Sequence, residues 1–315
     1  MSSTLRDKLA QVFKADAATT DLSSGGLLLD DQANRWLHQP LKDSVMLSEC
    51  RTEPMGSHTK DLPKMITPTS VAKPGVEGVA MPVADRSKVT FDEVVLQTNE
   101  IIAEARFPWG YLEDSMSQEQ LKQIVMTRLG LAFRNNVEQL AINGDTSSTD
   151  ALLALQDGWL ARFTSNVVAA GSVAPTKGTF STAIREMDEE WINDPEAMRH
   201  YIGPHAKLRY QELIADRMTN LGDGYFTGTA TVTGAGVPIV GVPLFPNEDG
   251  VGSNETTCLT TRPDNMIIGY WKERRIHMAT DVPARKDIVL LRTRVGVNIE
   301  WNDGATKTTG LLGKN

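Results

Sequence analysis

Hydrophobic residues recur at three- and four-residue steps between residues 117 and 143, the longest regular pattern in the chain. The apolar positions are Leu121, Ile124, Val125, Leu129, Ala132, Phe133, Val137, Leu140 and Ala141. This spacing predicts one helix with a continuous apolar face, and charged residues such as Glu138 take the remaining positions. Asp114, Ser115 and Ser117 precede it as capping residues, and Gly144 follows as a left-handed end residue. The helix would be about 40 Å long. It is either a long core helix of an ordinary enzyme or a spine along which flat domains lie.

A strand pattern occupies residues 65–107. Small or β-branched residues alternate with polar ones there, and prolines and glycines cluster in the first half. The pattern predicts a long two-stranded excursion with its tip near residues 73–78. An isolated ribbon is marginal in water. It must therefore pack on its own domain or on a partner, and the pattern leaves both alternatives open.

Residues 1–64 show no sustained hydrophobic period. They nevertheless contain a set of apolar residues with no local core: Leu27, Leu28, Leu29, Trp36 and Leu37. Such residues need burial elsewhere, on the body of the protein or on a neighbouring subunit. We interpret the segment as an extended arm, with a poorly patterned subdomain as the alternative.

The remainder of the chain predicts an α+β fold. Residues 167–178 look like a loop, and helices are expected over about 179–191 and 205–218. Short strands are expected at 237–240 and 243–245. Antiparallel strands follow from residue 256 onward, with an exposed turn at 281–286.

Composition narrows the possible classes. The 315-residue chain has a formal net charge of −8, which argues against a general nucleic-acid binder. A container for DNA remains compatible with it, because a strongly basic wall would hold phosphates at every contact. The two cysteines, Cys50 and Cys258, are far apart in the sequence and are expected to be free thiols. No apolar run is long enough to cross a bilayer.

Catalytic chemistry has little support in the sequence. The nucleophile-elbow, zinc-protease, Walker and dinucleotide motifs are absent. The stretch GATKTTG at 304–310 lacks the glycine that a phosphate loop places before its lysine. His200 and His205 are expected to be a surface pair, and paired acidic residues to lie on solvated faces. We therefore expect no catalytic residue, no cofactor and no metal site.

The order of these segments resembles the major capsid proteins of tailed bacteriophages, the Hong Kong 97 type of fold. The stretches that carry the resemblance are PVADRSKVTF, QTNEIIAEARFPWGYLEDS, VEQLAINGDT, TFSTAIREMDEEWIND, HAKLRYQELIADR, VPIVGVPLFPNED and NMIIGYWKERRIHMATDVPARKDIVLLRTRVGVNIEWND. Each motif is weak by itself. Their order and spacing match over roughly residues 65–310.

The resemblance implies a shell subunit with five parts. These are an N-terminal arm (1–64), an extended β loop (65–107), a peripheral domain with the spine helix (108–178), an axial domain (179–261) and returning strands of the peripheral domain (262–315). It also implies three inter-subunit contacts. They are the loop tip (Lys73, Pro74, Gly75, Val76 and Glu77), the peripheral turn (Asp281, Arg285 and Lys286) and the apolar arm residues.

The implied partners are further copies of the chain in pentamers and hexamers, a portal protein, separate scaffolding and decoration proteins, and packaged double-stranded DNA without sequence specificity. The implied location is the virion capsid, assembled in the host cytoplasm, with no membrane. Some family members cross-link through a lysine, an asparagine and a glutamate. Here the glutamate and asparagine positions fall near Arg292 and Lys286, so only non-covalent contacts are expected, although Lys73 lies at the loop tip. An encapsulin-type compartment and a cytosolic α+β hydrolase are the alternatives.

Overall fold

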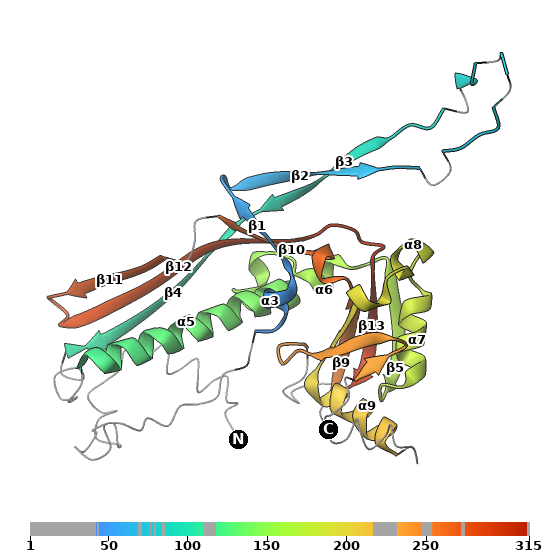
Figure 1. Ribbon diagram of the computed structural model, residues 1–315. Coiled ribbons are helices and arrows are strands. Elements are labelled where there is room, and N and C mark those ends of the chain that lie inside the picture. The colour runs from blue at the N-terminus through green and yellow to red at the C-terminus, as the bar shows by residue number, and fades with distance from the viewer. Residues whose placement is uncertain are drawn as a thin grey trace.

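The long periodic segment forms a helix, and a five-stranded sheet lies along it (Figure 1). The computed structural model describes residues 42, 44–68, 71–75, 77–78, 80–83, 86–109, 118–216, 232–246, 254–271 and 275–313. In chain order the elements are α3 (Met46–Glu49), β1 (Arg51–Met55), β2 (Thr59–Ile66), β3 (Thr90–Gln97), β4 (Asn99–Pro108), α5 (Gln118–Asn143), η3 (Leu153–Leu155), α6 (Trp159–Arg162), β5 (Asn166–Val173), α7 (Lys177–Arg185), α8 (Glu189–Ile192), η4 (Pro195–Ala197), β6 (Arg199–Ile202), α9 (Pro204–Ala215), β7 (Thr233–Gly234), β8 (Val237–Gly241), β9 (Glu255–Thr261), η5 (Pro263–Asn265), β10 (Met266–Trp271), β11 (Arg275–Asp281), β12 (Lys286–Ile299) and β13 (Ala305–Leu312).

The predicted spine helix is confirmed as α5, which has 26 residues. Its buried positions follow the predicted face: Leu129, Phe133, Val137, Leu140 and Ala141 all belong to the main core. The other side of that core comes from β12, whose Val289, Leu291 and Val295 are also buried. The proposed capping residues at 114–117 lie outside the described residues.

α5 ends just before Gly144, as predicted, but the reason for a glycine at this position differs from the prediction. Gly144 is not in the left-handed region, which the described glycines Gly78, Gly171, Gly236 and Gly310 occupy. A Cβ at Gly144 would instead lie 2.3 Å from the backbone oxygen of Gln156. Glycine is needed here because two backbone segments approach closely, and not because the helix turns left-handed.

The five-stranded sheet is centred on β12. The order is β1-β10-β12-β11, and β4 pairs with β12 on its other side. The antiparallel pairing of β12 with both β10 and β11 confirms the predicted returning strands. β1 joins the sheet by parallel pairing with β10, from Arg51↔Ile267 to Met55↔Trp271.

The extended excursion is a ribbon of β2 and β3 that projects away from the body (Figure 1). Its register runs from Thr59↔Gln97 to Ile66↔Thr90. The arm and the loop were expected to meet between residues 64 and 65, whereas the pairing of the ribbon begins at Thr59. Residues 46–64 form α3, β1 and most of β2. The two strands pair with β10 and β3, which are distant in sequence, so no local pattern indicated them.

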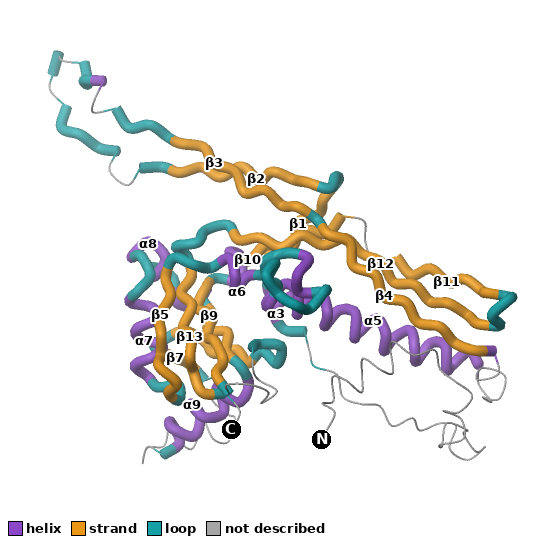
Figure 2. The backbone as a smooth tube through the Cα atoms, turned by 180° about the vertical axis from the view of Figure 1, so that it is seen from behind, coloured by secondary structure: helices purple, strands orange, loops and turns teal. Residues whose placement is uncertain are grey.

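A second sheet has six strands in the order β5-β13-β9-β6-β8-β7 (Figure 2). Residues 167–178 were expected to be a loop, but β5 pairs in parallel with the C-terminal strand β13. β13 in turn pairs with β9. The sequence-based boundary between residues 261 and 262 thus separates strands that share one sheet.

The predicted helix over 179–191 is divided into α7 and α8. Thr176 caps α7 by a reciprocal pair of hydrogen bonds with Thr179, and the helix ends at Arg185. After the break, Met187 packs with Met198 and Val237. Ile184 of α7 and Ile192 of α8 pack against the same cluster, so the break lets both helices cover it.

The predicted strand at 243–245 is a turn. Pro243 and Pro246 have no backbone N–H to donate to a neighbouring strand. The amide of Phe245 instead donates to the carbonyl of Val242 at 3.3 Å. The turn places Leu244 and Phe245 in the main core.

Candidate inter-subunit surfaces

The two faces of the ribbon differ in what covers them. Residues that are directly opposite in an antiparallel pair point to the same face. On the inner face Leu96 is fully buried against Met55 and Ile267 of the body. On the outer face Phe91 is 77% exposed and its partner Met65 is 61% exposed. The described part of the chain thus leaves a large apolar pair uncovered on the outer face.

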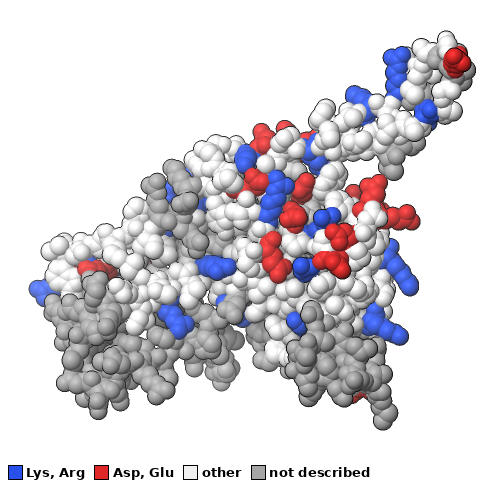
Figure 3. All heavy atoms as spheres, in the orientation of Figure 1, with Lys and Arg blue, Asp and Glu red and all other residues white. Residues whose placement is uncertain are grey.

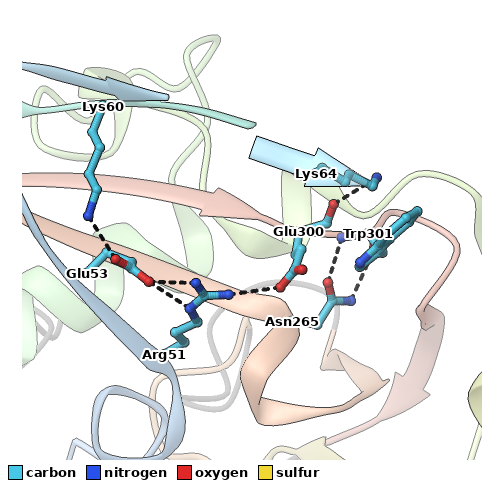
Figure 4. A network of polar contacts seen from close by, with 7 residues as sticks. All are labelled: Arg51, Glu53, Lys60, Lys64, Asn265, Glu300 and Trp301. Carbon is cyan, nitrogen blue, oxygen red and sulfur yellow. Dashed lines mark hydrogen bonds and ion pairs between the residues drawn. The ribbon is translucent and has the colours of Figure 1, made fainter. Parts of the chain in front are cut away.

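A polar network joins the base of the ribbon to the body (Figure 4). Glu53 of β1 accepts hydrogen bonds from Lys60 of β2 at 2.9 Å and from Arg51 at 2.8 Å. The Lys60 hydrogen bond is the main reason that the pKa of Glu53 lies below its usual value, and Arg51 acts in the same direction. Arg51 also reaches Glu300 at 3.1 Å.

Lys64 extends this network further along the ribbon. Its Nζ donates to the carbonyl oxygen of Glu300 at 3.1 Å and lies 3.3 Å from the ring centroid of Trp301. Asn265 holds Trp301 in place, because its side chain bonds both the N–H (2.7 Å) and the carbonyl (2.8 Å) of that residue. The arrangement is a cation–π contact on a fixed ring.

Burial and polar contacts have different roles at this junction. Exposed ion pairs contribute about 0–1 kcal/mol each, whereas burying one leucine contributes about 1.5–3 kcal/mol. Leu96 and its neighbours therefore provide most of the attachment. The charged network fixes the direction in which the ribbon leaves the body. On the face drawn in Figure 3, charges of both signs gather where the ribbon meets the body.

A second charged cluster crosses the five-stranded sheet. Glu100 of β4 pairs with Arg292 at 2.6 Å and Arg294 at 2.9 Å, both on β12. The Arg292 hydrogen bond is the main reason that the pKa of Glu100 is lowered. The guanidinium of Arg294 also lies 4.6 Å from the ring centroid of Trp271.

The predicted peripheral turn is confirmed as a turn between β11 and β12. Arg285 has a φ of 50°, and its amide donates to the carbonyl of Val282. Asp281 accepts from the amide of Ala284 at 3.2 Å. Arg285 is exposed, while Asp281 and Lys286 are half-buried. The structure thus brings the three predicted residues together at one end of the sheet.

The other predicted contact residues divide into two groups. At the loop tip Lys73, Pro74, Gly75 and Glu77 are exposed. Val76 and the arm residues Leu27, Leu28, Leu29, Trp36 and Leu37 lie outside the described residues.

Glu138 was expected on the polar side of α5, yet it is fully buried. Its Oε1 accepts a hydrogen bond from the backbone N–H of Met46 at 2.8 Å, at the start of α3. Desolvation raises its pKa to about 7, although the α3 amides and Arg134 favour the charged form. Glu138 therefore attaches α3, the first described element of the chain, to the spine helix.

The stability of the subunit should depend on pH through Glu138. The pKa of this carboxyl rises from 4.5 to about 7 on folding. The folded state then keeps a proton that the unfolded state loses, so stability falls as pH rises through this window, by up to about 3 kcal/mol. Glu138→Gln cannot titrate and should show a smaller decline. Urea unfolding of unassembled subunits at both ends of the window measures it, and equal declines in the two proteins would contradict the assignment.

His200 was expected at the surface, but it is fully buried in the six-stranded sheet. Its Nδ1 lies 2.7 Å from the Thr260 hydroxyl, and its Nε2 lies 3.0 Å from the Gly234 carbonyl. A carbonyl can only accept, so Nε2 carries the proton. Burial lowers the pKa of His200 to about 4. The side chain is thus a neutral, satisfied core residue.

The described residues provide no catalytic constellation. They contain no group of three or more histidine, cysteine or acidic side chains that could hold a metal. Cys50 and Cys258 are buried free thiols, and desolvation raises the pKa of each to about 12, so neither is a reactive thiolate. Within the same residues, none of the helices combines the length and the apolar content needed to cross a bilayer.

Comparisons with known proteins agree with this architecture. YqbE of Bacillus subtilis (strain 168), which is designated a prophage capsid protein, is 28% identical over 300 residues, covering 94% of this chain and 96% of its own length. The capsid of a native GTA particle superposes with a TM-score of 0.65 at 13% identity, covering 94% of this chain and 99% of the other. The capsid of Ralstonia phage GP4 superposes with a TM-score of 0.64 at 10% identity, covering 90% of this chain and 95% of the other.

The chain has the Hong Kong 97 type fold of phage capsid proteins. No family model matches it. The Hong Kong 97 type fold confirms the fold class expected from the order of segments. The ribbon anchor of Arg51, Glu53, Lys60 and Lys64, in contrast, was missed by sequence reasoning. The only sign of this anchor in the sequence was the presence of charged residues in strands. Lys64 and Glu300 are 236 positions apart, so their contact produces no pattern in either segment.

Proposed function

We propose that this chain is a phage major capsid protein, which assembles as pentamers and hexamers into an icosahedral shell around double-stranded DNA. Its role is structural and not enzymatic. The observation that carries the proposal is the ribbon, whose outer face exposes Phe91 and Met65 at 77% and 61%. Together with the capsid fold, this uncovered surface supports burial against a neighbouring copy.

The ribbon would be held in a fixed orientation before it binds a neighbouring subunit. Leu96 and the polar network at its base attach it to the body, so little freedom is lost when a neighbour binds. The loop tip (Lys73, Pro74, Gly75, Val76 and Glu77) would extend the same contact. The arm residues Leu27, Leu28, Leu29, Trp36 and Leu37 would form a second contact, and the turn with Asp281, Arg285 and Lys286 a third.

We also propose a role in assembly for each part of the chain. We assign axial contacts, at the centre of each capsomer, to about residues 179–261. Peripheral contacts, at the local threefold axes, are assigned to about 108–178 and 262–315. A portal protein at one vertex, separate scaffolding and decoration proteins, and assembly in the host cytoplasm complete the proposal. The net charge of −8 is compatible with an inner shell surface that neither recognises a DNA sequence nor binds DNA strongly.

Imaging of the purified protein tests this function. Expression of the full chain should yield closed shells in electron micrographs and a void-volume peak in size-exclusion chromatography. An encapsulin-type compartment would enclose a cargo protein in place of DNA when isolated from its native source. Monomers or small oligomers with enzymatic turnover would support the hydrolase alternative and overturn the proposal.

The shell should be held together without covalent cross-links. Cross-linking family members use a glutamate and an asparagine, and the matching positions in this chain fall near Arg292 and Lys286. Arg292 also forms an ion pair with Glu100 at 2.6 Å. Boiling assembled particles in detergent should therefore release a single monomer band at 34.5 kDa. Lys73→Ala particles serve as the control. A ladder of multimers that disappears in this variant would show that the cross-linking chemistry is present.

A further inference from the structure

β5 is the outermost strand of the six-stranded sheet, with β13 as its neighbour on one side (Figure 2). Its pairing with β13 is parallel and runs from Asn166↔Thr306 to Ala169↔Thr309. The backbone groups on the other edge are not paired with another strand within the described residues. Such an edge is a template on which a further strand can add.

The sequence of β5 gives this edge no protection. Proteins usually block exposed edge strands with charges or proline, or keep them very short. β5 has eight residues, NVVAAGSV, with neither a charge nor a proline. Among the described strands, the other edges are all blocked: β7 has only two residues, and each of β1, β2, β3, β4 and β11 has at least two charged residues.

Exposed and half-buried side chains alternate along the first five residues of β5. Val167 is 50% exposed and Ala169 is exposed as well, while Val168 and Ala170 are half-buried. The regular part ends at Gly171 and Ser172, which have φ values of 72° and 59°. The open edge is therefore a short segment over residues 166–170.

We infer that the free edge of β5 is an interface between copies of this chain, on which a second copy adds an extended segment by strand pairing. The proposed function makes a second copy the occupant, and the lack of charge on this edge lets two acidic copies approach each other there. Each copy has a formal net charge of −8, so two copies repel each other except where they meet through uncharged surface. An uncharged edge offers backbone hydrogen bonds and valine side chains without such repulsion. The inference rests on the proposed function, because a shell subunit must contact its copies on several sides.

Hydrogen exchange and one charged substitution test the inference on the full chain. Amides of residues 166–170 should exchange at least tenfold more slowly in assembled shells than in unassembled subunits. Val167→Lys should raise the concentration needed for assembly by roughly tenfold or more, the change expected from losing one moderate contact. Val167→Thr, which adds no charge, should assemble like the wild type.

Val167→Thr is the matched control, because it changes the same side chain without adding a charge. Circular dichroism should show that both variants are folded. Equal exchange at residues 166–170 in shells and subunits, or normal assembly of Val167→Lys, would overturn the inference alone. Failure of the wild type to form any shell would instead overturn the proposed function.

Discussion

Phe91→Asp should abolish shell assembly while leaving the subunit folded. The ring of Phe91 is 77% exposed in the single chain, so its loss removes little internal packing. In a shell, burial of a phenylalanine side chain contributes about 1.5–3 kcal/mol. An aspartate in its place would bring an unpaired carboxylate into the contact, which costs several kcal/mol more. Because symmetry repeats the contact in every subunit, the losses add over the particle.

Sedimentation velocity and negative-stain microscopy would measure the effect, and circular dichroism would monitor folding. Phe91→Leu is the matched control, since it keeps an apolar side chain at the same place and should form shells. If Phe91→Asp formed normal shells, the outer face of the ribbon would not be an inter-subunit contact.

Local patterns accounted for the main architectural elements. The helical period placed α5 to within one residue of the observed start at Gln118. The cluster of prolines and glycines between two strand patterns placed the ribbon. Both signals depend on residues that are near one another in sequence, because a helix face or a hairpin is determined within its own segment.

Contacts between distant segments were beyond such patterns. β1 pairs with β10, beginning at Arg51↔Ile267, and β5 pairs with β13, so neither strand could be recognised from its own residues. β5 was expected to be a loop, although Val167 and Val168 favour a strand, because its partner β13 lies far away in the sequence. Glu138 was assigned to the polar face because Met46, whose amide it binds, lies 92 positions away in the sequence.

The ribbon and the core illustrate why the candidate contact surfaces were only partly predictable. A sequence shows that residues such as Met65 are apolar, but it does not show which face of a strand the body covers. Leu96 and Phe91 are on the same strand and have opposite environments, at 0% and 77% exposure. Five positions separate them, so they point to opposite faces of the strand, and the packing against Met55 and Ile267 decides which face is buried.

Gly144→Ala should destabilise the subunit by about 3 kcal/mol, the upper part of the range for overpacking a rigid site. A Cβ at Gly144 would lie 2.3 Å from the oxygen of Gln156 and 2.6 Å from that of Leu140, both backbone atoms that cannot move aside. Gly158 faces the same contact, and its amide donates to the carbonyl of Gly144 at 2.9 Å. Urea unfolding of unassembled subunits would measure the loss, together with a reduced yield of folded protein.

Two further substitutions separate close approach from left-handed geometry at the end of α5. If Gly144 were needed for a positive φ, Gly144→Asn would be tolerated, since asparagine adopts that conformation readily. Close approach predicts instead that Gly144→Asn is at least as destabilising as Gly144→Ala. Gly130→Ala is the matched control in the same helix. Nothing lies within 4 Å of a Cβ at Gly130, so alanine should stabilise the subunit by up to about 1 kcal/mol through its higher helix propensity. A stable Gly144→Asn protein would contradict the explanation by close approach, because it would show that the backbone of residues 156–158 can shift to make room for a side chain.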